Sequence, residues 1–107
     1  MLFRSVFFDG AFSHAYRKAA FNAGSVTGLG VEVPHEATDE EVAFGRQVIT
    51  ASGRDLAYAR VDVVPSPAGP LLMELEAIEP SLQFVFAPGS EDRMARGLLK
   101  RAAQRGA

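Results

Sequence analysis

The stretch LAYARVDVVPSPAGPLLMELEAI, residues 56–78, decides the fold of this 107-residue chain. Apolar and polar residues alternate on both sides of a centre rich in Pro and Gly, residues 65–70, which is the pattern of two β-strands joined by a loop. We therefore expect strands over residues 56–64 and 71–78, the second ended by Pro80. Strands joined by so short a loop pair antiparallel.

The register of this strand pair decides which side chains share a face. In one register Val64 pairs with Leu72, and the charged residues of both strands lie on one face. In the other, Val64 pairs with Leu71, and the acidic residues point to opposite sides. The first is favoured because it gathers the apolar residues on the core face, namely Ala59, Val61, Val63, Met73, Leu75 and Ala77. The other face then holds opposed pairs, Asp62 with Glu74 and Arg60 with Glu76.

A second hairpin is expected near the start of the chain. Asp9-Gly10 is typical of a type I′ turn between two strands, because that turn needs positive φ at both central residues. The strands run over residues 5–8 and 11–18. Simple alternation then gives two faces, one with Phe7, Phe12, His14, Tyr16 and Lys18, the other with Val6, Phe8, Ala11, Ser13 and Arg17.

Residues 22–37 are rich in Gly, Ser, Thr and Pro and predict a loop, since Pro34 excludes a central strand there. Thr38 and Glu41 form a capping box that begins a helix, and Gly53 ends it. A last helix begins near Ser90, with a buried stripe of Met94, Leu98 and Ala102. The order strand, strand, helix, strand, strand, helix predicts one α+β domain over residues 1–107, an antiparallel sheet with helices packed on one face.

Composition excludes several classes of protein. Apolar residues make up 48% of the chain and include eight Phe, enough for one small core. The net charge of −2 argues against a nucleic-acid binder, and the absence of Cys excludes disulfides, thiolate zinc sites and a cysteine nucleophile. With no membrane-length apolar run and no signal-peptide pattern, we expect a soluble cytoplasmic protein that binds neither membrane nor nucleic acid.

The charged face of residues 56–78 is the main candidate site. Three carboxylates on neighbouring strands repel one another, so the cluster needs a cation. Oxygen ligands without His or Cys select Mg²⁺, Mn²⁺ or Ca²⁺. The alternative is an ordinary solvated sheet face on which Arg60 pairs with Glu76, and the pattern alone favours that alternative.

Residues 58–64, YARVDVV, with residues 71–81, LLMELEAIEPS, resemble the C-terminal half of an ATP-grasp domain. The closest likeness is to the branch with glutathione-synthetase-like enzymes and the cycloserine-forming cyclo-ligase. The resemblance implies a Mg²⁺ site, with Asp62 as the first ligand, Glu74 as the bridging ligand and Glu76 at the family's usual Asn position. It also implies a catalytic role for Arg60, which would stabilise the transferred phosphoryl group.

The resemblance extends to residues 5–18, SVFFDGAFSHAYRK, which are similar to the family's hairpin before a basic phosphate-binding residue. Lys18 occupies the place of that residue, and Arg17 is its substitute. Gly28 and Gly30 lie in the loop that closes over the substrate in the family. The earlier half of the domain, with its adenine pocket and phosphate-binding lysine, has no counterpart, so the resemblance implies the C-terminal portion of a longer enzyme.

By this resemblance the function is that of an ATP- and Mg²⁺-dependent carboxylate–amine ligase, with Mn²⁺ as an alternative metal. The reaction passes through an acyl phosphate, and the partners are ATP, a small carboxylate and an amine. The chain alone is expected to be inactive, and its protein partner would be the missing N-terminal half or a second copy. A non-catalytic binding or assembly module and an inert gene fragment are the alternatives, since an exposed hairpin edge and a Phe-rich start invite association.

Overall fold

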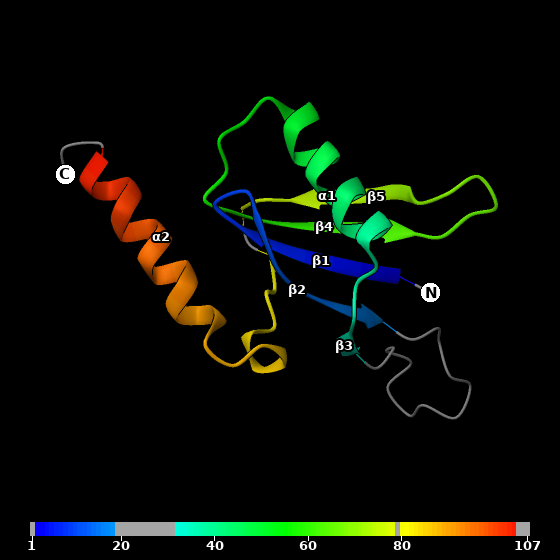
Figure 1. Cartoon of the computed structure of the whole chain (residues 1–107), viewed down its shortest axis with the longest axis horizontal. Coiled ribbons are helices and arrows are strands. Elements are labelled where there is room, and N and C mark those ends of the chain that lie inside the picture. The colour runs from blue at the N-terminus through cyan, green and yellow to red at the C-terminus, as the bar shows by residue number, and fades with distance from the viewer. Residues whose placement is uncertain (1, 19–31, 79, 105–107) are drawn as a thin grey trace.

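The computed structural model describes residues 2–18, 32–78 and 80–104, which form a five-stranded antiparallel sheet with two helices (Figure 1). The strands are β1 (Leu2–Phe8), β2 (Ala11–Lys18), β3 (Glu32–His35), β4 (Tyr58–Val64) and β5 (Leu71–Glu76), in the order β3-β2-β1-β4-β5. The helices are α1 (Asp39–Ser52) and α2 (Ser90–Gln104), with a short 3₁₀ turn, η1 (Phe84–Phe86), before α2. The predicted α+β class and antiparallel sheet are confirmed.

The turn between β1 and β2 has the predicted geometry. Asp9 and Gly10 have φ values of 53° and 79°, which a type I′ turn requires. Phe8 pairs with Ala11, as the two-residue turn predicts. Next to the turn, the two turn residues alone are therefore enough to explain how β1 and β2 pair.

A β-bulge changes the rest of this hairpin. Phe7 pairs with Phe12, but Val6 pairs with His14, so Ser13 is the extra residue. The predicted faces were therefore wrong beyond the bulge: His14, Tyr16 and Lys18 lie on the face of Val6, opposite the face of Phe7. A bulge leaves no clear mark in one sequence, because it adds a residue without breaking the apolar pattern.

β3 lies within the segment that was predicted to be a loop. It pairs with the end of β2, with Pro34 opposite Tyr16. β3 is an edge strand, and the edge is the position at which a sheet tolerates proline. The prediction that Pro34 excludes a central strand is therefore confirmed, whereas the prediction of a loop at these residues was wrong. Gly28 and Gly30 lie outside the described residues.

Both faces of the sheet carry apolar side chains, and each face is covered by a different helix or segment. On one face α1 covers Phe7, Val61 and Val63 with its own side chains Phe44, Val48 and Ile49. On the other, Val6, Phe8, Tyr16 and Leu82 pack with residues around η1 and the start of α2, namely Phe84, Phe86 and Met94. The helices therefore do not share one face, because β1 places large apolar residues on both sides in turn.

The predicted ends of α1 are confirmed, whereas the predicted buried stripe of α2 is only partly present. Thr38 Oγ1 accepts a hydrogen bond from the Glu41 backbone N–H at 3.1 Å, and Gly53 ends α1 in the left-handed region, as predicted. In α2, Met94 is half-buried but Leu98 is 41% exposed and Ala102 is exposed, so the predicted buried stripe was wrong after its first residue. The described segment before α2 covers this sheet face instead. Neither helix of the described residues is long and apolar enough to cross a membrane.

Candidate functional site

The β4–β5 hairpin combines the two registers that the sequence allowed. Asp62 pairs with Glu74, and Arg60 with Glu76, so the charged residues share one face as expected. Near the loop, however, Val64 pairs with Leu71, which is the other register, because a bulge lies between the two parts. Met73 is the extra residue and is 62% exposed, not in the core as predicted.

Arg60 and Asp62 form a buried ion pair on this face. Arg60 Nε donates to Asp62 Oδ1 at 2.8 Å, and Nη2 donates to Oδ2 at 2.9 Å. Arg60 is 7% exposed and Asp62 is 2% exposed, so this part of the sheet is not a solvated face. Burial by itself would lower the pKa of Arg60, but the hydrogen bonds and charge of Asp62 outweigh it and raise that pKa, so the guanidinium stays charged.

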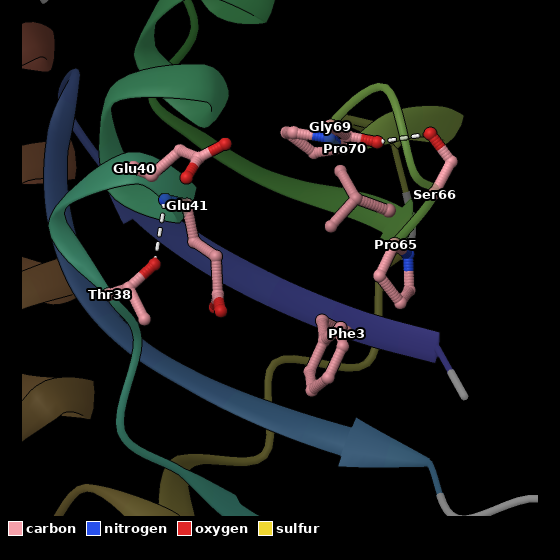
Figure 2. A pocket seen from close by; sticks show the side chains of 9 residues that line it. Phe3, Thr38, Glu40, Glu41, Pro65, Ser66, Gly69 and Pro70 are labelled. Carbon is pink, nitrogen blue, oxygen red and sulfur yellow. Dashed lines mark hydrogen bonds between the residues drawn. The ribbon is translucent and has the colours of Figure 1, made fainter.

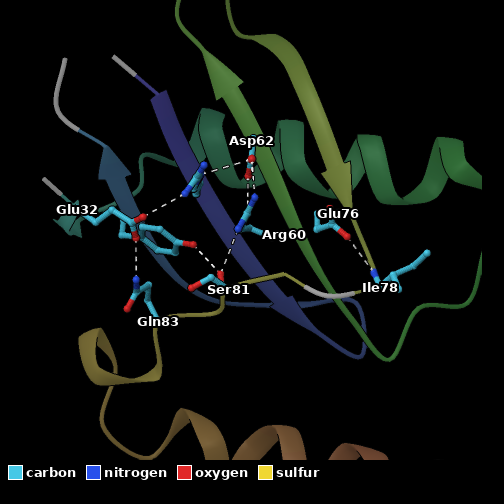
Figure 3. A network of polar contacts seen from close by, with 9 residues as sticks. Glu32, Arg60, Asp62, Glu76, Ile78, Ser81 and Gln83 are labelled. Atoms are coloured by element: carbon cyan, nitrogen blue, oxygen red, sulfur yellow. Dashed lines mark hydrogen bonds and ion pairs between the residues drawn. The ribbon is translucent and has the colours of Figure 1, made fainter. Parts of the chain in front are cut away.

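A second arginine, Arg4, reaches the same carboxylate, in the polar network of Figure 3 where Asp62, Arg60 and Glu32 are labelled. Arg4 Nε lies 3.5 Å from Asp62 Oδ2, and its Nη1 lies 3.3 Å from Glu32 Oε1. Glu32 in turn accepts a hydrogen bond from Gln83 Nε2 at 2.8 Å. Sequence reasoning missed Arg4 and Glu32, because they join the site only through the pairing of β1 with β4 and of β3 with β2.

Residues 80–83, here called the covering segment, lie over this ion pair. Tyr16 Oη donates to the Ser81 carbonyl at 2.6 Å, and Arg60 Nη1 donates to it at 3.4 Å. Burial raises the pKa of the Tyr16 hydroxyl, although the positive charges of Arg60 and Arg4 oppose this, so the hydroxyl remains a donor. Tyr16 therefore holds the Ser81 carbonyl beside the guanidinium of Arg60, within hydrogen-bond distance of its Nη1.

His14 holds the next residue of the covering segment. Its Nε2 donates to the Leu82 carbonyl at 2.7 Å, and its Nδ1 lies 2.8 Å from Ser13 Oγ. Burial lowers the pKa of His14, which favours the neutral ring. The histidine therefore holds the covering segment in place, and among the described residues it belongs to no group of His, Asp and Glu side chains that could hold a metal.

The remaining predicted site residues are less enclosed. Glu74 is exposed, and Glu76 Oε1 accepts a hydrogen bond from the Ile78 backbone N–H at 3.2 Å. Lys18 lies on the face of Arg4, since it pairs with Leu2, whereas Arg17 lies on the opposite face. The structure thus places five of the six predicted site residues, Lys18 among them, on one face and leaves Arg17 on the other.

The three predicted metal ligands differ in their surroundings. Both oxygens of Asp62 are bound by Arg60, so the set of three carboxylates does not fit a metal ion in this arrangement. Within residues 2–18, 32–78 and 80–104, no three His, Asp or Glu side chains are gathered in a way that could hold a metal.

A pocket of about 260 Å³ lies on the α1 face, away from this site (Figure 2). It is lined by Phe3, Thr38, Glu40, Glu41, Val63, Pro65, Ser66, Gly69 and Pro70. None of the predicted site residues lines it. Glu41 at its rim is bound to His35, with 2.8 Å between Oε2 and Nε2.

Comparisons with solved structures support the resemblance of this sheet, with its charged β4–β5 face, to part of an ATP-grasp domain. The crystal structure of the D-cycloserine synthetase DcsG matches 94% of the chain with a TM-score of 0.80 and 30% identity, over 37% of its own length. A D-alanine–D-alanine ligase from Bacillus anthracis matches 99% of the chain with a TM-score of 0.67 at 16% identity, over 41% of its length, and shows the shared fold.

The sequence comparison points to the same branch. The cycloserine biosynthesis protein DcsG of Streptomyces lavendulae is 33% identical over 106 positions, which cover 89% of this chain and 36% of that protein. The chain therefore spans little more than a third of the relative it matches. No family model matches the chain.

Proposed function

We propose that the chain is the phosphate- and metal-binding C-terminal portion of an ATP-dependent carboxylate–amine ligase. The observation that carries this proposal is the charged face of β4 and β5. There the buried Arg60 lies on the same face as Glu74 and Glu76, in a chain whose fold matches a D-cycloserine synthetase and a D-alanine–D-alanine ligase. A solved structure of that D-alanine–D-alanine ligase in complex with ATP matches this chain with a TM-score of 0.63 at 18% identity, which supports ATP as the nucleotide.

The reaction would proceed in two transfers. A carboxylate oxygen attacks the γ-phosphorus of ATP, which releases ADP and leaves an acyl phosphate. The amine then attacks the acyl carbon, and phosphate leaves as the amide forms and the nitrogen loses a proton. Protein groups accelerate such transfers mainly by positioning the reactants and neutralising charge.

Two cationic side chains of this chain would supply that neutralisation. Arg60 keeps its charge and presents a guanidinium whose plane is set by Asp62. Lys18 would bind phosphate from the same face of the sheet, and Arg17 is less suited because it lies on the other face. A guanidinium fixed in advance stabilises developing charge without reorganising during the reaction.

When bound, Mg²⁺ or Mn²⁺ would neutralise the phosphates of ATP. Glu74, which is exposed, and Glu76 beside it on β5 are the carboxylates that would hold it, and Mg²⁺ commonly takes only one or two carboxylates together with water and phosphate oxygens. The substrates would be a small carboxylate and an amine.

Calorimetry tests the proposal. Mg²⁺ is titrated into the folded chain with and without ADP. We expect binding that needs both Mg²⁺ and ADP and that vanishes in the Glu74→Gln, Glu76→Gln variant. The matched control, Glu40→Gln with Glu91→Gln, removes the same charge elsewhere and should bind normally. A folded chain that shows no heat of binding under any of these conditions contradicts the proposal.

A second candidate function is a non-catalytic assembly module. β5 is an edge strand, and three neighbouring apolar side chains at its start are exposed, namely Leu71, Leu72 and Met73. Exposed apolar edge strands favour association with another chain. Association that is unchanged by the Glu74→Gln, Glu76→Gln substitutions and independent of Mg²⁺ would favour this function.

A further inference from the structure

We propose that Asp62 positions the guanidinium groups of Arg60 and Arg4 and does not ligate a metal ion. The inference rests on the proposed function, because it reassigns one residue of the proposed site. It separates the roles of the acidic residues on this face: Asp62 fixes cationic side chains, whereas Glu74 and Glu76 remain the carboxylates for a cation.

The first argument is the use of the Asp62 oxygens. Arg60 binds them as a fork, with Nε on Oδ1 at 2.8 Å and Nη2 on Oδ2 at 2.9 Å. Arg4 Nε adds a second positive group 3.5 Å from Oδ2. A metal ion approaching this carboxylate would meet two guanidinium charges of its own sign at close range, where the dielectric screening of a buried site is weak.

The second argument is access. Asp62 is 2% exposed, and the Ser81 carbonyl, which Tyr16 holds, accepts a hydrogen bond from Arg60, the partner of Asp62. A metal ion that took both oxygens of Asp62 would displace Arg60, and this would leave a buried guanidinium without its counter-ion. Glu74, opposite Asp62 on β5, is exposed and offers a cation a carboxylate without that cost.

The third argument is that the ion pair with Asp62 fixes the orientation of the Arg60 guanidinium. Two parallel hydrogen bonds fix the plane of a guanidinium, which a single bond does not. With Nε and Nη2 occupied, Arg60 directs Nη1 toward the Ser81 carbonyl at 3.4 Å. Asp62 therefore acts through Arg60 and is a positioning residue.

Nuclear magnetic resonance on the whole chain tests this directly. Mg²⁺ is added with ADP while two signals are followed: the side-chain carboxyl carbons and the Nε–Hε group of Arg60. We expect the Glu74 and Glu76 carboxyl signals to move, while those of Asp62 and Arg60 stay in place. A shift of the Asp62 carboxyl signal together with loss of the Arg60 signal overturns the inference.

Substitution gives a second readout. In Asp62→Asn we expect affinity for Mg²⁺ with ADP within about threefold of the parent chain, while the Arg60 Nε–Hε proton exchanges with water at least about tenfold faster. The matched control, Glu74→Gln, should leave that exchange unchanged. If Asp62→Asn binds Mg²⁺ with ADP as poorly as Glu74→Gln, Glu76→Gln does, Asp62 is a ligand and the inference fails. Should Asp62→Asn not fold, the titration of the parent chain decides alone.

The two proposals can fail separately. A parent chain that binds no Mg²⁺ with ADP contradicts the proposed function. In that case the exchange rate of the Arg60 proton still decides the inference: unchanged exchange in Asp62→Asn shows that Asp62 does not position Arg60, whereas faster exchange supports the positioning role.

Discussion

Gly45 lies where α1 packs on β1. A Cβ atom added there would lie 2.6 Å from Phe7 Cζ and 2.7 Å from Cε1, closer than real contacts allow. Phe7 is 1% exposed in the core and has no room to retreat. We therefore expect Gly45→Ala to lower the free energy of unfolding by about 1–3 kcal/mol, as overpacked cores do, despite the better helix propensity of Ala. Urea unfolding measures this.

Gly97 in α2 provides the matched control. A Cβ atom added there meets nothing within 4 Å, so only helix propensity changes. Gly97→Ala should raise the free energy of unfolding by up to about 1 kcal/mol. If both variants stabilise the chain, α1 does not press on Phe7 as the structure shows.

His14 makes stability depend on pH. Because burial lowers its pKa below the ordinary 6.5, the unfolded chain takes up the proton at higher pH than the folded chain does. The stabilisation is therefore complete above about pH 6.5 and is lost as the pH falls through the window below it.

The comparison variant is His14→Gln, which keeps a donor for the Leu82 carbonyl but does not titrate. Urea midpoints of the parent chain should fall more than those of His14→Gln between about pH 7.5 and about pH 5.5. Equal falls in the two proteins would show that His14 is not the group responsible.

At the end of α2, Arg101 ties the helix to two separate parts of the chain. Its Nη2 contacts Asp9 in the β1–β2 turn, Asp55 Oδ1 at 2.9 Å and the Leu56 carbonyl at 3.1 Å. These contacts raise the pKa of Arg101, chiefly through the hydrogen bond to Asp55. Because Leu98 and Ala102 are not buried, we expect this side chain to hold the second half of α2 to the rest of the chain.

We expect Arg101→Met to speed hydrogen exchange of the backbone amides in residues 98–104 while the strand amides keep their protection. Local opening is easiest where few buried contacts hold an element. Arg96→Met is the control, since Arg96 forms an ion pair with Asp92 of the same helix and not with another part of the described chain. Similar exchange in both variants would show that Arg101 does not hold the helix.

Both hairpins show how far elements could be predicted. The turn at Asp9-Gly10 and the opposition of Asp62 and Glu74 were confirmed, because turn chemistry and side-chain alternation act between neighbouring residues. The bulges at Ser13 and Met73 were not foreseen, since each results from fitting a strand to its partners on the sheet. Because of the bulge at Ser13, Tyr16 lies on the same face of the sheet as Arg4 and Arg60.

The whole chain is expected to bind nucleotide without completing a reaction. It spans 36% of the sequence relative and 37% of the D-cycloserine synthetase structure that it matches. Phosphoryl transfer depends on holding both reactants in line, which a surface on one side of the nucleotide does not provide. We expect no formation of ADP or amide above background in a coupled assay with ATP, Mg²⁺ and a carboxylate and amine pair. ATP-dependent ligation by the purified chain would contradict this.

Local patterns in the sequence were enough to predict the α+β class, the two hairpins, the bounds of α1 and the shared face of the charged residues of β4 and β5. These features depend on alternation, capping and turn residues, which act over a few positions. Three others depend on contacts between distant segments: the pairing of Arg4 with Asp62, the covering of Arg60 by Ser81, and the two-sided core. Burial, which turned an expected open face into an enclosed ion pair, is a property of the assembled fold, because it depends on which segments finally lie over a residue.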